Sequence, residues 1–129
     1  MPTTELHANP NNVMTSEQMV ELAKSRDTAL RAAVAGRSDC PVGVLASLVH
    51  DGKPEVRRAI AGSPRLSMAL SQVLENDKDS TVLLALLGNP LVDVAVIGHL
   101  SASRHPDVSL EAVRILRAMH DRADGIVRD

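Results

Sequence analysis

The chain has 129 residues, the size of one domain, and carries 14 Lys and Arg against 16 Asp and Glu, a formal net charge of −2. This balance excludes a strongly basic protein but leaves room for a local basic patch. Hydrophobic residues make up 44% of the chain, yet Phe, Tyr and Trp are absent. The usual aromatic anchors of protein interfaces and the stacking platforms for single-stranded nucleic acid are therefore missing.

The sequence repeats itself at a fixed interval. Leu30, Val56, Val82 and Val108 follow one another at a spacing of 26 residues. Glycines and leucines keep the same spacing at Gly36, Gly62 and Gly88, and at Leu22, Leu48, Leu74 and Leu100. A period of this size, in which no unit can bury its apolar face alone, is typical of stacked helical repeats. We therefore predict an all-α fold, a short α-solenoid of two-helix repeats with a cap at each end.

The N-terminal part, about residues 6–26, is predicted to form a cap and an incomplete repeat. Thr15 is followed three residues later by Gln18, the pattern of a capping box. The helix expected after it contains Met19 and Leu22 and matches the second helix of a repeat. The first twelve residues show no basic-then-apolar pattern, so no signal peptide is expected.

Three repeats are predicted at about 27–52, 53–78 and 79–104. In the second repeat, Val56 and Ile60 fall on one face of a short helix that Pro54 begins and Gly62 ends. Ser67 is placed to cap a second helix, whose apolar positions are Leu70, Val73 and Leu74. The other two repeats follow the same plan, which favours stacking of short helices over stability of each helix alone.

The last unit departs from this plan. Arg114 stands where the earlier repeats have Gly, and the apolar spacing continues through Leu116 and Met119. We predict one longer capping helix over about 105–120, followed by a polar tail at 121–129. The whole chain, 1–129, is interpreted as a single α-helical repeat domain.

These features resemble one known family. The segments Pro54-Glu55-Val56-Arg57-Arg58-Ala59-Ile60-Ala61-Gly62-Ser63-Pro64 and Leu84-Ala85-Leu86-Leu87-Gly88-Asn89-Pro90, with an echo at Ala8-Asn9-Pro10, resemble the leucine-rich repeat variant family, a relative of HEAT-like repeats. The resemblance covers roughly residues 8–116. It implies a right-handed, armadillo-like superhelix of alternating short helices and says little about function.

Two activities of related proteins are not expected here. Some relatives hold an iron–sulphur cluster, but the single Cys40 cannot supply the usual four thiolates, so no cofactor is predicted. Other HEAT-like proteins resemble alkylpurine DNA glycosylases, which need aromatic residues around the base. A chain without aromatic residues does not fit that activity.

Basic residues supply the first candidate surface. Arg31 and Arg57 share one repeat position and Arg58 follows, so that stacking would place them along one edge. The stretch 24–65 holds eight basic and four acidic residues, which suits an acidic peptide or a phosphate backbone. Alternatively, Arg57 and Arg58 pair across neighbouring loops with acids such as Glu55, Asp27, Asp51 or Asp79.

An apolar pair supplies the second candidate surface. Leu83 and Leu87 occupy positions that are charged or small in the earlier repeats, and they are neighbours on one helix face. If exposed, they would mark a surface for a partner or for self-association. Alternatively, the terminal helix covers them.

No motif points to catalysis or to a metal. The five histidines form no tight ligand pair, and no phosphate loop, nucleophile elbow or zinc signature is present. Cys40 lies before Pro41 and is expected to be a small turn residue. We predict a non-enzymatic, cytoplasmic scaffold that binds a protein or itself and no membrane, with weak electrostatic binding of nucleic acid through 24–65 as the alternative.

Overall fold

The computed structural model of the chain describes residues 13–128 and the side chains of residues 13–123. All regular structure in this part of the chain is helical, which confirms the all-α prediction. The eight helices of the described residues are, in order, α2 Ser16–Leu22, α3 Thr28–Ala35, α4 Val42–Leu48, α5 Pro54–Ala61, α6 Met68–Leu74, α7 Ser80–Leu87, α8 Val94–Leu100 and α9 Pro106–Arg128.

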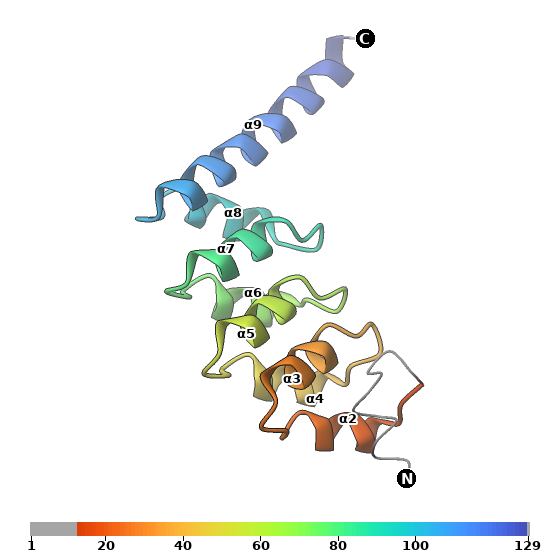
Figure 1. Cartoon of the computed structure of the whole chain (residues 1–129). Helices are drawn as coiled ribbons and strands as arrows, with labels where there is room; N and C mark the ends of the chain where they lie inside the picture. The colour runs from red at the N-terminus through yellow and green to blue at the C-terminus, as the bar shows by residue number, and fades with distance from the viewer. Residues whose placement is uncertain (1–12, 129) are drawn as a thin grey trace.

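The helices fall into two classes that alternate along the chain. The first helices α3, α5, α7 and α9 begin at residues 28, 54, 80 and 106, and the second helices α4, α6 and α8 begin at residues 42, 68 and 94. The first helices pack on one another, α3 on α5, α5 on α7 and α7 on α9. The pairs follow one another from the N-terminal end to the C-terminal end of the molecule (Figure 1).

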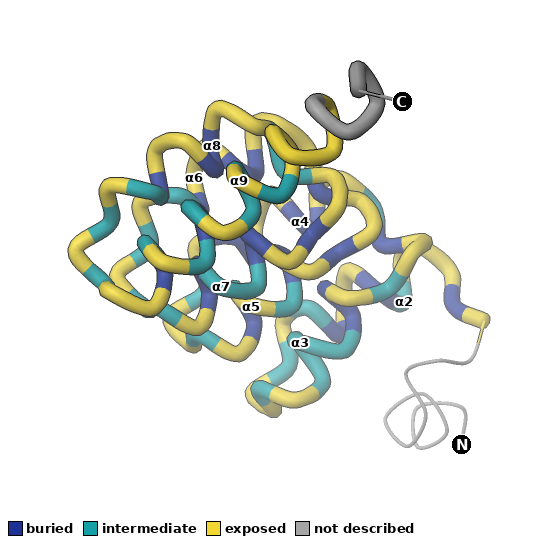
Figure 2. The backbone as a smooth tube through the Cα atoms, turned by 90° about the horizontal axis from the view of Figure 1, so that it is seen from above, coloured by how far each residue is buried: buried dark blue, intermediate teal, exposed yellow. Residues whose placement is uncertain are grey.

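The core lies between the row of first helices and the row of second helices (Figure 2). Val56, Val82 and Val108 are fully buried on the first helices, and Leu48, Leu74 and Leu100 are buried on the second helices. Each such side chain contributes about 1.5 to 3 kcal/mol by leaving water. Helices of seven or eight residues are marginal in isolation, so this packing holds them together.

Side chains cap most of the helix starts. The capping box at α2 is confirmed, because Thr15 Oγ1 accepts from the Gln18 N–H at 3.1 Å and Gln18 Oε1 accepts from the Thr15 N–H at 2.8 Å. Ser67 caps α6 through the Leu70 N–H at 3.2 Å, also as predicted. Asp27, Asp79 and Asp93 cap α3, α7 and α8.

The turn between the two helices of a pair begins at a glycine. Gly36, Gly62 and Gly88 end the first helices with φ between −77° and −90°, so none uses the left-handed conformation. In the third turn, the buried Asn89 side chain donates to the carbonyls of Ala61 and Ser63, both at 2.8 Å. This buried amide ties two successive turns together.

The two predicted caps have different outcomes. Residues 6–12 of the predicted N-terminal cap lie outside the described residues. At the other end, α9 runs to Arg128, so the predicted helix end near residue 120 is wrong and most of the predicted polar tail is helical. No glycine or proline interrupts the helix between Pro106 and Gly125, which accounts for its continuation.

Candidate functional site: the loop edge

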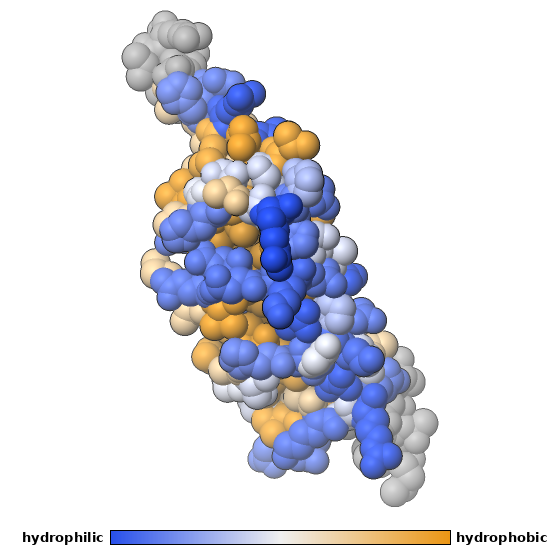
Figure 3. Space-filling model, turned by 90° about the vertical axis from the view of Figure 1, so that its left-hand side faces the viewer, coloured by the Kyte–Doolittle hydropathy of each residue, from blue (hydrophilic) through white to orange (hydrophobic). Residues whose placement is uncertain are grey.

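The loops that lead from a second helix to the next first helix lie on one side of the molecule, at the left of Figure 1. We call this side the loop edge and define it by residues 23–27, 49–53, 75–79 and 101–105. Figure 3 looks onto it and shows hydrophilic side chains along its length, with apolar surface between them. The predicted residues Arg31, Arg57 and Leu83 all belong to first helices beside these loops.

Arg31 connects the first two loops. Its Nη1 donates to the Ser25 carbonyl at 2.9 Å, while Nε and Nη2 donate to the two carboxylate oxygens of Asp51 at 2.8 and 3.1 Å. The side chains of both partners are mostly buried, at 15% and 10% exposure. Hydrogen bonding from Arg31 lowers the pKa of Asp51 below its usual value, with help from the Lys53 N–H. We call this bridge between two loops a rung.

Arg57 forms the same rung one unit later. Its Nη1 donates to the Asp51 carbonyl at 2.8 Å, and Nε and Nη2 donate to the Asp77 carboxylate at 2.7 and 3.1 Å. The hydrogen bond with Asp77 raises the pKa of the Arg57 guanidinium. Both rungs join residues twenty positions apart in the chain. Arg31 and Arg57 are therefore structural bonds between loops and leave little of their charge for a partner.

The third position of the series has no rung. Leu83 stands where Arg57 stands one unit earlier, and Ser103 stands where Asp77 does. Ser103 Oγ still accepts from the His105 N–H at 3.2 Å, as the Asp51 and Asp77 carboxylates accept from Lys53 and Asp79. The cation and the carboxylate of the rung are replaced together, while the hydrogen bond that shapes the loop is kept.

Leu83 and Leu87 lie in the core. Their exposures are 3% and 4%, so they do not form the exposed surface and the alternative in which they are buried holds. The terminal helix α9 packs on α7, and Leu87 borders a groove between them with Ile115 and Met119. Positions that hold an arginine stem or a small residue in the earlier helices are also packed, and Leu fills them with aliphatic carbon.

The acids of the loop edge are taken up by internal bonds. Asp51 and Asp77 hold the rungs, and Asp27 and Asp79 cap helices. Glu75 lies 3.0 Å from Nδ1 of His99. Asp27 is exposed, and the other four acids are partly buried. Little carboxylate surface on this edge is free to repel an anion.

The cations of the loop edge point outward instead. Each of the four loops carries an exposed cation, at Arg26, Lys53, Lys78 and Arg104. None of these side chains forms an ion pair with any residue that the structure describes. Arg58 is exposed on α5. Hydrogen bonds from Thr81 are the main cause of the lowered pKa of Asp79, and the charge of Arg58 adds to the effect.

Two clefts open between successive loops of this edge. The cleft between loops 49–53 and 75–79 has a volume of about 400 Å³ and is walled by Arg57 and Leu74. The cleft between loops 75–79 and 101–105 has a volume of about 320 Å³, with Leu83 and Leu100 inside and Lys78 and Arg104 among its walls. The two clefts have equivalent positions in successive units, and Leu83 takes the place of Arg57 in the second one.

Sequence reasoning missed one exposed apolar surface. Val42, Met68 and Val94 are the first residues of α4, α6 and α8, and they are 65%, 60% and 52% exposed. Their spacing of 26 residues was the signal that could have found them. The neighbouring exposed positions are small or uncharged, such as Ala69 and Gly98, so the surface carries no charge to suggest a ligand.

The remaining candidates show no reactive arrangement. Burial raises the pKa of the Cys40 thiol to about 11, so the thiol is protonated near neutral pH. No group of three or more metal-ligating side chains forms among residues whose side chains the structure describes. In the same part of the chain, no helix combines the length and apolar character needed to cross a bilayer.

The chain matches no protein-family model, and no curated protein and no solved structure is significantly similar to it. The resemblance to the leucine-rich repeat variant family therefore stays a prediction from the sequence.

Proposed function

We propose that this chain is a short, right-handed α-solenoid that acts as a non-enzymatic scaffold in the cytoplasm and binds an acidic segment of a partner protein along the loop edge. One observation carries the proposal. On this edge the carboxylates are held by arginines, backbone amides and His99, whereas Arg26, Lys53, Lys78 and Arg104 project into solvent. An anionic ligand meets attraction there and little repulsion.

The spacing of the cations suits an extended peptide. Packed helices lie about 8 to 10 Å apart, so successive loops offer a cation at about that interval. An extended chain advances about 3.3 Å per residue, and every third residue therefore reaches the next loop. Aliphatic side chains between the acidic ones fit the first cleft, where Val73 is 41% exposed. This combination of charge and apolar contact favours a peptide over a bare polyanion.

Nucleic acid is the alternative ligand, and the geometry weakens the case for it. Within the stretch 24–65, Arg31, Arg37 and Arg57 are bound to Asp51, Asp39 and Asp77. The sequence has no aromatic side chain on which a base could stack. The exposed cations are not confined to this stretch, because Lys78 and Arg104 lie outside it. Nucleic acid is therefore tested as a competing ligand beside the peptide.

Fluorescence anisotropy with a labelled peptide tests the proposal. The peptide carries Glu at every third position and Leu beside each Glu, and the matched control peptide carries Gln in place of Glu. We expect the acidic peptide to bind at low salt, and the double variant Lys78→Gln/Arg104→Gln to lose at least about tenfold in affinity, since each charge-assisted contact contributes roughly 1 kcal/mol. The Gln peptide should bind weakly to both.

A second double variant provides the control. Arg65 and Arg117 are exposed cations outside the loop edge, so Arg65→Gln/Arg117→Gln removes the same charge and should change affinity by less than about twofold. Equal losses in the two double variants would show that only net charge matters. Tighter binding of RNA or DNA than of the peptide, or no binding of the peptide at low salt, would overturn the proposal.

A further inference from the structure

The terminal helix α9 differs from all other described helices in length. It has 23 residues against seven or eight in the others, which corresponds to about 34 Å against about 12 Å. Its first half packs on α7 and α8 through Val108, Ala112 and Ile115. Its second half runs beyond the stack of helices (Figure 1). A helix segment with so little support from its own chain is a candidate for contact with another molecule.

The sequence of this second half keeps the register of a second helix. Leu22, Leu48, Leu74 and Leu100 are buried on the second helices, and the next position in the series is Ile126. Ala123 likewise follows Leu45, Ser71 and Ile97, which are also buried. Residues 120–126 thus keep two of the three core positions of a second helix apolar, at Ala123 and Ile126, although they continue α9 instead of folding back.

The missing turn explains why this segment does not fold back. Arg114, Ile115 and Leu116 stand where the preceding unit has Gly88, Asn89 and Pro90. Arg114 donates through Nε and Nη2 to the carboxylate of Glu111 one turn earlier, at 2.9 and 2.6 Å. This pair and the loss of Gly and Pro favour an uninterrupted helix.

A groove lies beside α9 where a further second helix would stack. It has a volume of about 440 Å³ and borders α8, the turn from α7 to α8 and α9. Its apolar walls are Leu87, Val92, Ile97, Ile115 and Met119. Met119 is 37% exposed, and no described residue beyond α9 covers the groove. Arg122, one turn beyond Met119 on the same helix, also lines this groove.

We infer that the second half of α9 fills this groove in a second copy of the chain, and that two copies do so reciprocally around a two-fold axis. Each copy lacks a second helix over its groove, and each offers a segment with the apolar positions of that helix. A reciprocal exchange satisfies both needs and closes the assembly at two chains. The groove lies away from the loop edge, so this self-association is independent of the proposed binding of an acidic peptide.

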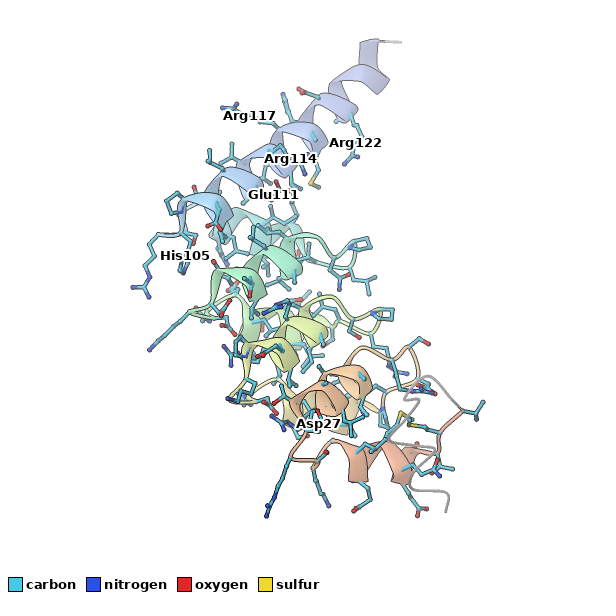
Figure 4. The ribbon with its side chains drawn as sticks, viewed as in Figure 1. Asp27, His105, Glu111, Arg114, Arg117 and Arg122 are labelled. Atoms are coloured by element: carbon cyan, nitrogen blue, oxygen red, sulfur yellow. The ribbon has the colours of Figure 1, made fainter. Side chains whose placement is uncertain are left out.

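The charged residues near the groove fit this arrangement. Arg122 stands at the position of the buried Val44, Leu70 and Val96, so one of the three core positions of the segment is charged. Figure 4 shows Arg117 and Arg122 projecting from different sides of α9, with Glu111 and Arg114 nearer the body. Arg122 lines the groove of its own chain beside Glu111 and Arg114, so its stem borders the apolar contact of the dimer.

Light scattering on the full chain tests this inference. We expect twice the 13.7 kDa mass of one chain at micromolar to millimolar concentration, little affected by salt because the contact is apolar. Ile126→Glu should raise the dissociation constant at least about a hundredfold, since two-fold symmetry removes two buried Ile side chains per dimer. Met119→Glu, inside the groove, should weaken the dimer in the same direction.

Leu110→Glu is the matched control. Leu110 is 71% exposed on the side of α9 opposite Met119, and the substitution introduces the same charge into the same helix. This variant should remain dimeric, and circular dichroism should show unchanged helix content in all three variants. A wild-type chain that stays monomeric, or a dimer that survives both Ile126→Glu and Met119→Glu, would overturn the inference.

Discussion

The three equivalent positions along the loop edge solve the same packing problem in two ways. In the first two, Arg31 and Arg57 join successive loops through a carboxylate and a backbone carbonyl. In the third, Leu83 packs in the core and Ser103 replaces the carboxylate. The comparison teaches that the aliphatic stem of Arg and the Leu side chain fill similar space. The guanidinium is present only where an Asp carboxylate lies opposite to accept its hydrogen bonds.

The largest expected difference between the two kinds of position comes from removing the acceptor. Asp77→Ala leaves the Arg57 guanidinium without its carboxylate and the Asp79 N–H without an acceptor. We expect a loss of about 2 to 3 kcal/mol in the free energy of unfolding. Ser103→Ala at the equivalent third position removes one hydrogen bond and should cost about 1 kcal/mol or less. Urea unfolding of both variants measures the difference, and equal losses would contradict the distinction.

Installing a rung at the third position should sharpen the comparison. Leu83→Arg replaces a buried aliphatic side chain by a cation with no carboxylate opposite, and we expect it to cost about 2 kcal/mol of stability. Leu83→Arg combined with Ser103→Asp should recover about 1 kcal/mol or more of that loss. A double-mutant cycle from urea unfolding gives the coupling energy. A coupling near zero would show that the geometry of the first two rungs does not extend to the third.

Acid should weaken the first rung. The pKa of Asp51 is lower in the folded chain than in the unfolded chain. The stability that Asp51 contributes is therefore fully present above the unfolded pKa of about 3.9, and it is lost as the pH falls through the folded pKa. The Asp51→Asn variant lacks this contribution, so its stability should fall less steeply below about pH 4. Thermal unfolding from neutral to acidic pH compares the two chains. Parallel pH profiles would mean that Asp51 is not stabilised by Arg31.

The smallest expected effect concerns the exposed cations of the same edge. Lys78→Gln and Arg104→Gln change side chains that have no partner among the described residues, and stability should shift by no more than about 0.5 kcal/mol. Thermal unfolding at moderate salt measures the shift. A loss as large as that of Asp77→Ala would assign these cations to the fold and remove the argument for a ligand.

Much of the fold could be predicted from repeated residues. The Pro54 start, the Thr15 capping box and the Ser67 cap depend on local rules that neighbouring structure does not override. The long terminal helix followed from Arg114 at a glycine position. Its end did not, because the polar residues after His120 form helix as readily as they form a tail.

The candidate site was predicted less well. Arg31 and Arg57 were placed correctly on one edge, but their partners lie twenty residues away and depend on how the loops stack. A signal for the pairing was present, since Arg is accompanied by Asp at that separation in two units and Leu by Ser in the third. Leu83 and Leu87 were judged peripheral because equivalent positions are charged or small. The error lies in treating a buried arginine stem as a surface position.

The most direct test of the central claim is an NMR titration of the labelled chain with the acidic peptide, in which shifts of assigned backbone amides report the surface that is bound. The account predicts shifts confined to residues 23–27, 49–53, 75–79 and 101–105 and to the first cleft beside Val73, and their loss in Lys78→Gln/Arg104→Gln. Shifts centred on the exposed surface of Val42, Met68 and Val94, with the loop edge unchanged, would contradict it.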